Sequence, residues 1–208
     1  MADLALLALT LVWGTTFTLV KRALDGTSPA VFLTLRFGLA LAAAGLVWAW
    51  RRPPRSAGVW RHGALLGLAM FGGFALQTVG LRYTPPARSG FLTGLAVLLV
   101  PLVARFHLGR RVMLASWAGV LLAVAGLLLL TRPFGGDVDG AVRIGDALTM
   151  GCAVAYALQI VWTSEFSPLH PLRSLTLIQI AVTLAGSLAL LAAEPARLRP
   201  SPELWGTV

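Results

Sequence analysis

One arginine lies deep inside an apolar stretch of this sequence, where a charge needs a specific environment. Arg36 is about seven residues from the start of the run 29–50, so roughly 10 Å of helix separates it from the nearer end. A cation at that depth in lipid is costly unless it snorkels to the headgroups, pairs, or faces a wet cavity. If Arg36 snorkels, it only touches lipid headgroups. If it faces a wet cavity, it binds an anionic or zwitterionic group of a ligand.

Uncharged polar and aromatic side chains occur inside or beside several other apolar runs. In lipid such groups turn toward the bundle interior and often only bridge helices by hydrogen bonds. A set spread over several helices also fits the wall of one polar cavity, whose aromatic rings would stack on apolar parts of a solute. Together with Arg36, the residues predicted to line this cavity are Trp13, Thr16, Gln77, Tyr83, Thr93, Tyr156 and Gln159.

Signatures of catalysis and metal binding are missing from the sequence. It contains no HExxH, GxSxG or P-loop motif. No carboxylate falls in the middle of an apolar run, so neither an intramembrane acid pair nor a proton relay is visible. Cys152 is the single cysteine, and His62, His107 and His170 fall in connectors without ligand spacing. We therefore expect no metal site, no cofactor and no enzymatic activity.

The composition predicts a chain that spans a membrane. Of the 208 residues, 57% are hydrophobic and only 12% are charged, whereas a soluble domain carries about 25% charged residues. The formal net charge of +9 comes almost entirely from arginines at the ends of apolar runs, where they meet lipid headgroups. Because these arginines form no stripe or aromatic-interleaved patch, we expect contacts with membrane lipids and none with nucleic acid.

Apolar runs recur at lengths near the roughly 20 residues that cross a bilayer. Seven are predicted to be helices, at 4–20, 29–50, 63–81, 86–104, 112–130, 145–163 and 172–193. Pro101 removes a backbone hydrogen bond inside the fourth run and is expected to kink that helix. Asp146 stands at the start of the sixth, where a carboxylate can cap a helix. The predicted fold class is all-α, a polytopic transmembrane helix bundle.

Small residues spaced four apart indicate where helix backbones approach closely in lipid. The pairs are Gly63 with Gly67, Gly90 with Gly94, and Ala115 with Gly119. The arginine-rich connectors at 51–61 and 105–111 favour a cytoplasmic N-terminus, although the basic pair 21–22 argues the other way.

The same runs resemble the drug/metabolite transporter superfamily, specifically its EamA-type inner-membrane proteins. The segments that carry the resemblance are WGTTFTLVKRAL, LRFGLALAAAGLVW, GLRYTPPARSGFLTGLAVLLVPLVARFHLG, SWAGVLLAVAGLLLL and GDALTMGCAVAYALQIVW. The resemblance implies ten helices in two five-helix repeats of opposite orientation, with the solute bound near the midplane between them. It also implies export or exchange of amino acids, metabolites or drugs by alternating access, without ATP hydrolysis, in the bacterial inner membrane.

The chain departs from the family pattern in two places. Arg110 in LGRR replaces the acid that the family often has in LGE, which weakens any ion pair built on that acid. The resemblance also implies a first repeat at 1–131, a polar connector at 132–144 and a second repeat at 145–208 with only two of its five helices. We therefore expect a fragment or a truncated product. A homodimer, an inactive fragment, and a non-transporting membrane protein (an assembly factor or an intramembrane enzyme) remain open alternatives.

Overall fold

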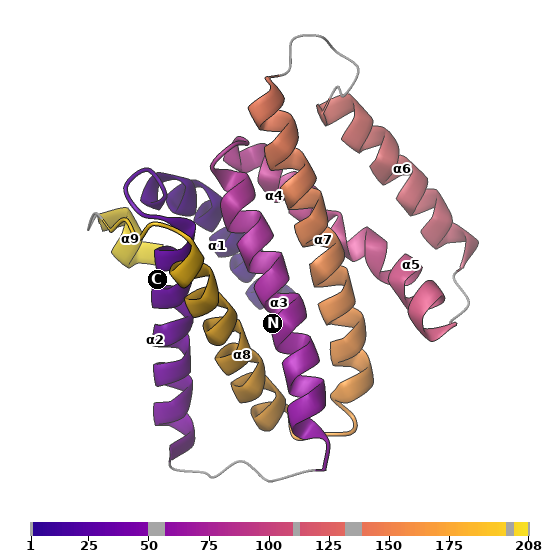
Figure 1. Cartoon of the computed structure of the whole chain (residues 1–208). Helices are drawn as coiled ribbons and strands as arrows, with labels where there is room; N and C mark the ends of the chain where they lie inside the picture. Colours follow the sequence, from indigo (N-terminus) through magenta and orange to yellow (C-terminus); the bar gives the residue numbers. More distant parts are fainter. Residues whose placement is uncertain (1, 50–56, 110–112, 132–138, 199–201, 208) are drawn as a thin grey trace.

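The computed structural model describes residues 2–49, 57–109, 113–131, 139–198 and 202–207, and all regular secondary structure in these ranges is helical (Figure 1). The helices, in chain order, are α1 (Ala2–Ala23), α2 (Pro29–Ala49), α3 (Val59–Leu81), α4 (Pro86–Gly94), α5 (Ala96–Leu108), α6 (Leu114–Thr131), α7 (Gly140–Phe166), α8 (Leu172–Ala193) and α9 (Pro202–Thr207). The predicted all-α class is confirmed. Arg110, where the chain departs from the family pattern, lies outside the described residues.

Helices of membrane length account for most of the predicted runs. Among the described residues, those long and apolar enough to cross a bilayer are Pro29–Val47, Val59–Leu81, Pro86–Leu108, Gly140–Phe166 and Leu172–Ala193. α6 contains a shorter apolar stretch, and α1 covers the first predicted run, although the side chains of residues 1–10 lie outside the description. The bundle is therefore a polytopic membrane protein, as the hydropathy pattern predicted.

The fourth predicted run forms two helices, not one helix kinked at its proline. α4 and α5 are separated by Leu95, whose N–H donates to the Leu92 carbonyl at 3.2 Å. The Leu95 carbonyl in turn accepts from the N–H groups of Leu98 and Leu99, both at 3.0 Å. Bonds to the third residue back tighten the backbone locally toward a 3₁₀ turn. Pro101 lies further along, inside α5, so the break in this run is at Leu95 and not at the proline.

The start of α7 also differs from the sequence prediction. The helix begins at Gly140, and its cap is Asp139, whose Oδ1 accepts the N–H of Ala141 at 3.1 Å. Asp146 therefore lies inside the helix, and the prediction that it caps the start is wrong. The predicted connector 132–144 thus ends in helix, because hydropathy marks the uninterrupted apolar part of a helix, and Arg143 interrupts the first turns of α7.

α3 lies at the centre of the bundle, between α8 and α7 (Figure 1). Its most extensive contacts are with these two helices, and α2 packs against α8. The core at one end of α3 joins Phe17 and Val20 of α1 to Phe32, Leu33 and Phe37 of α2, all under 9% exposed. Leu204 of α9 belongs to the same cluster, so helices from the early and late parts of the chain share one core.

Glycines on α3 allow α8 to approach closely. A Cβ on Gly63 would lie 2.7 Å from the side chain of Ile178, and one on Gly67 would lie 2.6 Å from that of Val182. The first predicted small-residue pair therefore does pack a helix, as expected where no hydrophobic drive brings helices together. Only ordinary contacts, or none, surround the glycines of the other two predicted pairs, Gly90, Gly94 and Gly119.

Candidate solute site

The residues of α1 and α3 that line a small cavity follow the same spacing along their two helices. The residues lie at i, i+3, i+4 and i+7 on both α1 and α3, which places each set on a single helix face. They are Trp13, Thr16, Phe17 and Val20 on α1 and Phe74, Gln77, Thr78 and Leu81 on α3, joined by Arg36 from α2. The cavity measures about 10 Å³, which is room for about one water molecule.

Arg36 is turned toward the bundle. Its guanidinium carbon lies 5.2 Å from the ring centroid of Phe74 on the neighbouring helix and 6.0 Å from that of Phe32 on its own helix. A cation over an aromatic face gains about 0.5 to 2 kcal/mol, more where water is excluded. Among the described residues, no carboxylate lies within salt-bridge distance of Arg36. This geometry favours the cavity-facing alternative over the snorkelling one.

The ring of Phe74 connects Arg36 to a further helix. Phe74 meets Phe37 edge to face at 5.0 Å and Tyr156 of α7 edge to face at 5.6 Å. Tyr156 thus reaches the predicted site through Phe74. The sequence analysis did not single out Phe74, although it lies three residues before Gln77 and therefore on the same helix face.

A buried hydrogen bond extends the site to α4. Gln77 Nε2 donates to Thr93 Oγ1 at 3.1 Å, and the two side chains are 8% and 1% exposed. Thr93 also lines a second, mainly apolar cavity of about 470 Å³ between α1 and α4, whose wall includes Trp13 and Phe17. Because Trp13 and Phe17 line both cavities, the polar and the apolar hollow adjoin each other. Thr16 is at the edge of this arrangement, with its hydroxyl donating to the Trp13 carbonyl at 2.6 Å.

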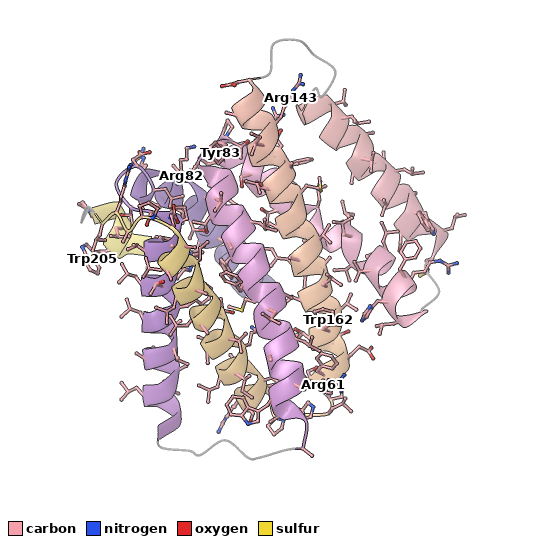
Figure 2. All side chains as sticks on the ribbon, viewed as in Figure 1. Arg61, Arg82, Tyr83, Arg143, Trp162 and Trp205 are labelled. Carbon is pink, nitrogen blue, oxygen red and sulfur yellow. The ribbon has the colours of Figure 1, made fainter. Side chains whose placement is uncertain are left out.

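Two predicted cavity residues lie elsewhere. Tyr83 follows the end of α3 and is 41% exposed, beside Arg82 at one end of the bundle (Figure 2). Because α3 ends at Leu81, the Tyr83 ring belongs to the turn and not to the cavity wall. Gln159 Nε2 donates to Gln179 Oε1 at 3.3 Å, which bridges α7 and α8. The structure therefore does not place either side chain in the cavity.

A charged cluster that the sequence analysis missed joins α4 to α7. Arg88 Nε lies 2.9 and 2.8 Å from the two carboxylate oxygens of Asp146, and its Nη2 lies 2.6 Å from Oδ2. Thr84 Oγ1 donates to Asp146 Oδ1 at 2.9 Å. The Arg88 and Asp146 side chains are only 16% and 12% exposed. This is a bidentate, largely buried pair between segments far apart in the sequence, and it fixes α4 against α7.

The histidines lie at or near helix ends. His62 and His107 fall inside α3 and α5, which corrects their predicted place in connectors. His62 Nδ1 and His170 Nε2 are 2.7 Å apart, and Trp162 Nε1 donates to His107 Nε2 at 2.9 Å. Arg61 and Trp162 mark this end in Figure 2, opposite the end marked by Arg143. Among the described residues, no three potential metal ligands form a group.

Membrane-length helices packed on both sides of α3 define the class of the molecule, a polytopic α-helical membrane protein. The chain belongs to the EamA-like transporter family, whose model matches residues 1–132.

Relatives of this chain carry transporter names. It is 35% identical over 169 residues to an uncharacterized transporter of Archaeoglobus fulgidus, covering 81% of this chain and 50% of that protein. It is 28% identical to the uncharacterized transporter YyaM of Bacillus subtilis, covering 98% of this chain and 70% of that protein. A crystal structure matches with a TM-score of 0.59 and 25% identity, covering 93% of this chain and 70% of that one. The chain thus spans half the length of its archaeal relative.

Proposed function

We propose that the protein transports a small organic solute with an anionic group across the membrane, by alternating access and without ATP hydrolysis. The observation that carries this proposal is the Arg36 guanidinium, which lies inside the bundle over Phe74 without a carboxylate partner among the described residues. A half-buried cation of this kind attracts an anion that enters the site. The transporter names of the relatives favour this function over an enzymatic one.

The two adjoining cavities support a solute with both a charged and an apolar part. In this proposal the anionic group binds Arg36 and the Gln77 amide, while the apolar part occupies the cavity between α1 and α4 against Trp13 and Phe17. A carboxylate matches the planar fork of a guanidinium. Amino acids and other metabolites with a carboxylate, or anionic drugs, are the proposed solutes.

The small volume at Arg36 supports a change of conformation during transport. About 10 Å³ cannot hold an organic anion, so the helices around Arg36 must separate for the solute to bind. We propose that the repeats 1–131 and 145–208, linked through 132–144, provide this movement in the full-length protein, and that it exports solutes from the bacterial cytoplasm. Inverted repeats rocking around a midplane site are a common basis of alternating access.

Solute flux into liposomes tests the proposal. We expect the full-length protein to transport some organic carboxylates and to discriminate against their uncharged amides. The Arg36→Gln variant should lower kcat/KM for the anion by about tenfold or more, because one lost charge-assisted contact is worth about 1.4 kcal/mol or more. The yield of folded protein, measured by gel filtration in detergent, should hardly change.

Arg173→Gln is the matched control, since Arg173 is an exposed arginine in the first turn of α8. It should transport like the unmodified protein. Equal flux by the Arg36→Gln variant would return Arg36 to a structural role. No flux of any carboxylate, amine or nucleotide sugar would favour a non-transporting membrane protein.

A further inference from the structure

A polar hollow lies at one end of the bundle, where α1 ends, α2 begins, and α3 and α8 end. Its volume is about 480 Å³, and its wall includes Asp25, Thr27, Ser28, Arg82, Arg197 and Leu198. We refer to it as the helix-end pocket. Arg36 is not among its lining residues, so it is separate from the candidate solute site.

Thr27 is an unsatisfied polar group in the wall of this pocket. The residue is 2% exposed, and its Oγ1 has no hydrogen-bond partner within the described part of the chain. A buried hydroxyl without a partner is unfavourable, and native structures contain few of them. Neighbouring atoms cover this oxygen fully, so the Thr27 side chain would have to rotate toward the pocket for an acceptor atom of a ligand to satisfy the hydroxyl.

The charges of the pocket favour an anion. Two guanidinium groups, of Arg82 and Arg197, line it against the single carboxylate of Asp25. Arg82 Nη1 lies 3.3 Å from Glu194 Oε1, in a pair whose side chains are 39% and 24% exposed. Over the described residues, no carboxylate lies within salt-bridge distance of the Arg197 guanidinium. A ligand anion can therefore bind the Arg197 guanidinium without displacing a carboxylate, whereas Arg82 already has one.

The backbone holds Arg197 against the start of α2. The N–H of Ser28 donates to the Arg197 carbonyl at 2.9 Å, and Ser28 Oγ accepts the Arg197 N–H at 3.4 Å. Ser28 directly precedes Pro29, the first residue of α2. The N-terminal end of a helix carries a partial positive charge, and at α2 the Glu194 Oε2 atom already accepts the N–H of Ala30 at 3.2 Å. The two bonds to Ser28 thus hold the Arg197 backbone at the start of α2.

We propose that the helix-end pocket binds a phosphate group, which accepts hydrogen bonds from the Thr27 hydroxyl and the Arg197 guanidinium. A tetrahedral phosphate offers acceptor oxygens in several directions at once and is a common partner of arginine. The pocket lies at the end of membrane-length helices, with the 51% exposed Leu198 in its wall and the 61% exposed Trp205 on the neighbouring helix α9. Tryptophan is enriched at the depth of lipid headgroups. A phospholipid headgroup and a free phosphate compound share this chemistry.

Lipid and phosphate binding to the purified full-length protein in detergent tests the proposal. Native mass spectrometry and apparent Tm are measured with phosphatidylglycerol, with phosphatidylcholine and with inorganic phosphate. We expect phosphatidylglycerol to bind saturably and to raise Tm. Arg197→Gln should weaken this binding about tenfold. Thr27→Val should weaken it several-fold, and Thr27→Ser should restore it, because serine keeps the hydroxyl.

Arg173→Gln serves again as the control, as an exposed arginine that is not in the wall of the pocket, and it should bind like the unmodified protein. If inorganic phosphate displaces phosphatidylglycerol, the pocket recognises free phosphate compounds. If it does not, the pocket recognises the lipid. Both results support a phosphate site. The proposal would be overturned if every variant bound phosphatidylcholine as tightly as phosphatidylglycerol. It would also be overturned if Arg197→Gln or Thr27→Val bound phosphatidylglycerol as tightly as Arg173→Gln does. None of these readouts depends on transport.

Discussion

Replacing Asp146 by asparagine is expected to lower the free energy of unfolding by about 2–4 kcal/mol. Arg88 holds both carboxylate oxygens of Asp146, and Thr84 donates to one of them. Removing one partner of a buried ion pair leaves the other charge without compensation, which costs about 3–5 kcal/mol. Because the two side chains keep 16% and 12% exposure, water reduces this cost. Unfolding in mixed micelles of increasing SDS content measures the difference.

The exposed pair Arg82–Glu194 is the matched control for this prediction. Its side chains are 39% and 24% exposed, and exposed ion pairs contribute about 0–1 kcal/mol. Arg82→Gln should therefore have a small effect. A double-mutant cycle with Arg88→Gln and Asp146→Asn should give a coupling energy of about 1 kcal/mol or more. A coupling energy near zero, or an Asp146→Asn variant as stable as Arg82→Gln, would show that the pair does not hold α4 against α7.

Replacing Gly145 by alanine is expected to destabilise the bundle by about 1–3 kcal/mol, the usual cost of overpacking. A Cβ on Gly145 would lie 2.9 Å from the carbonyl oxygen of Gly80 on α3 and 2.9 Å from the backbone nitrogen of Thr84. These are backbone atoms, which cannot rotate away as a side chain can. The helices would have to separate at this crossing, and with them Asp146 from its partners. The same SDS titration measures the effect.

Gly72→Ala is the control for this substitution. Gly72 lies on α3, and a Cβ there would meet no atom within 4 Å. Alanine in the interior of a helix is more favourable than glycine by up to about 1 kcal/mol, so this variant should be as stable as the unmodified protein or more stable. Equal stability of the Gly145→Ala and Gly72→Ala variants would mean that α3 and α7 do not cross as closely as described.

The membrane-length helices could be predicted from the sequence because the bilayer sets their length. Charge is so costly in lipid that the apolar runs are long and the arginines gather at their ends. The same cost identified Arg36 as a residue that needs a partner inside the bundle, and the structure shows it over Phe74. Trp13, Thr16 and Gln77 were also predicted beside it, and all three line the cavity with Arg36.

What the sequence could not predict depends on which helices are neighbours. Arg88 and Asp146 lie in different apolar runs, and nothing in either run shows that α4 packs on α7. Gln159 was assigned to the cavity because a polar residue in an apolar run needs a partner, but that partner is Gln179 on α8. Helix ends were missed for another reason. Hydropathy does not reveal the first turns of α7, which Arg143 interrupts, or the break at Leu95 between α4 and α5.

The central position of α3 has a consequence for the biogenesis of the protein. Its main partners, α7 and α8, are synthesised more than 50 residues after α3 is complete. At a synthesis rate of about 5–20 residues per second, several seconds pass between the completion of α3 and the emergence of these partners from the ribosome. During this time its glycine face at Gly63 and Gly67 lacks the α8 side chains of Ile178 and Val182 that cover it in the finished bundle. Larger apolar side chains at these glycines should therefore leave the insertion of α3 into the membrane unimpaired and lower the yield of the packed bundle, at the step where α8 docks.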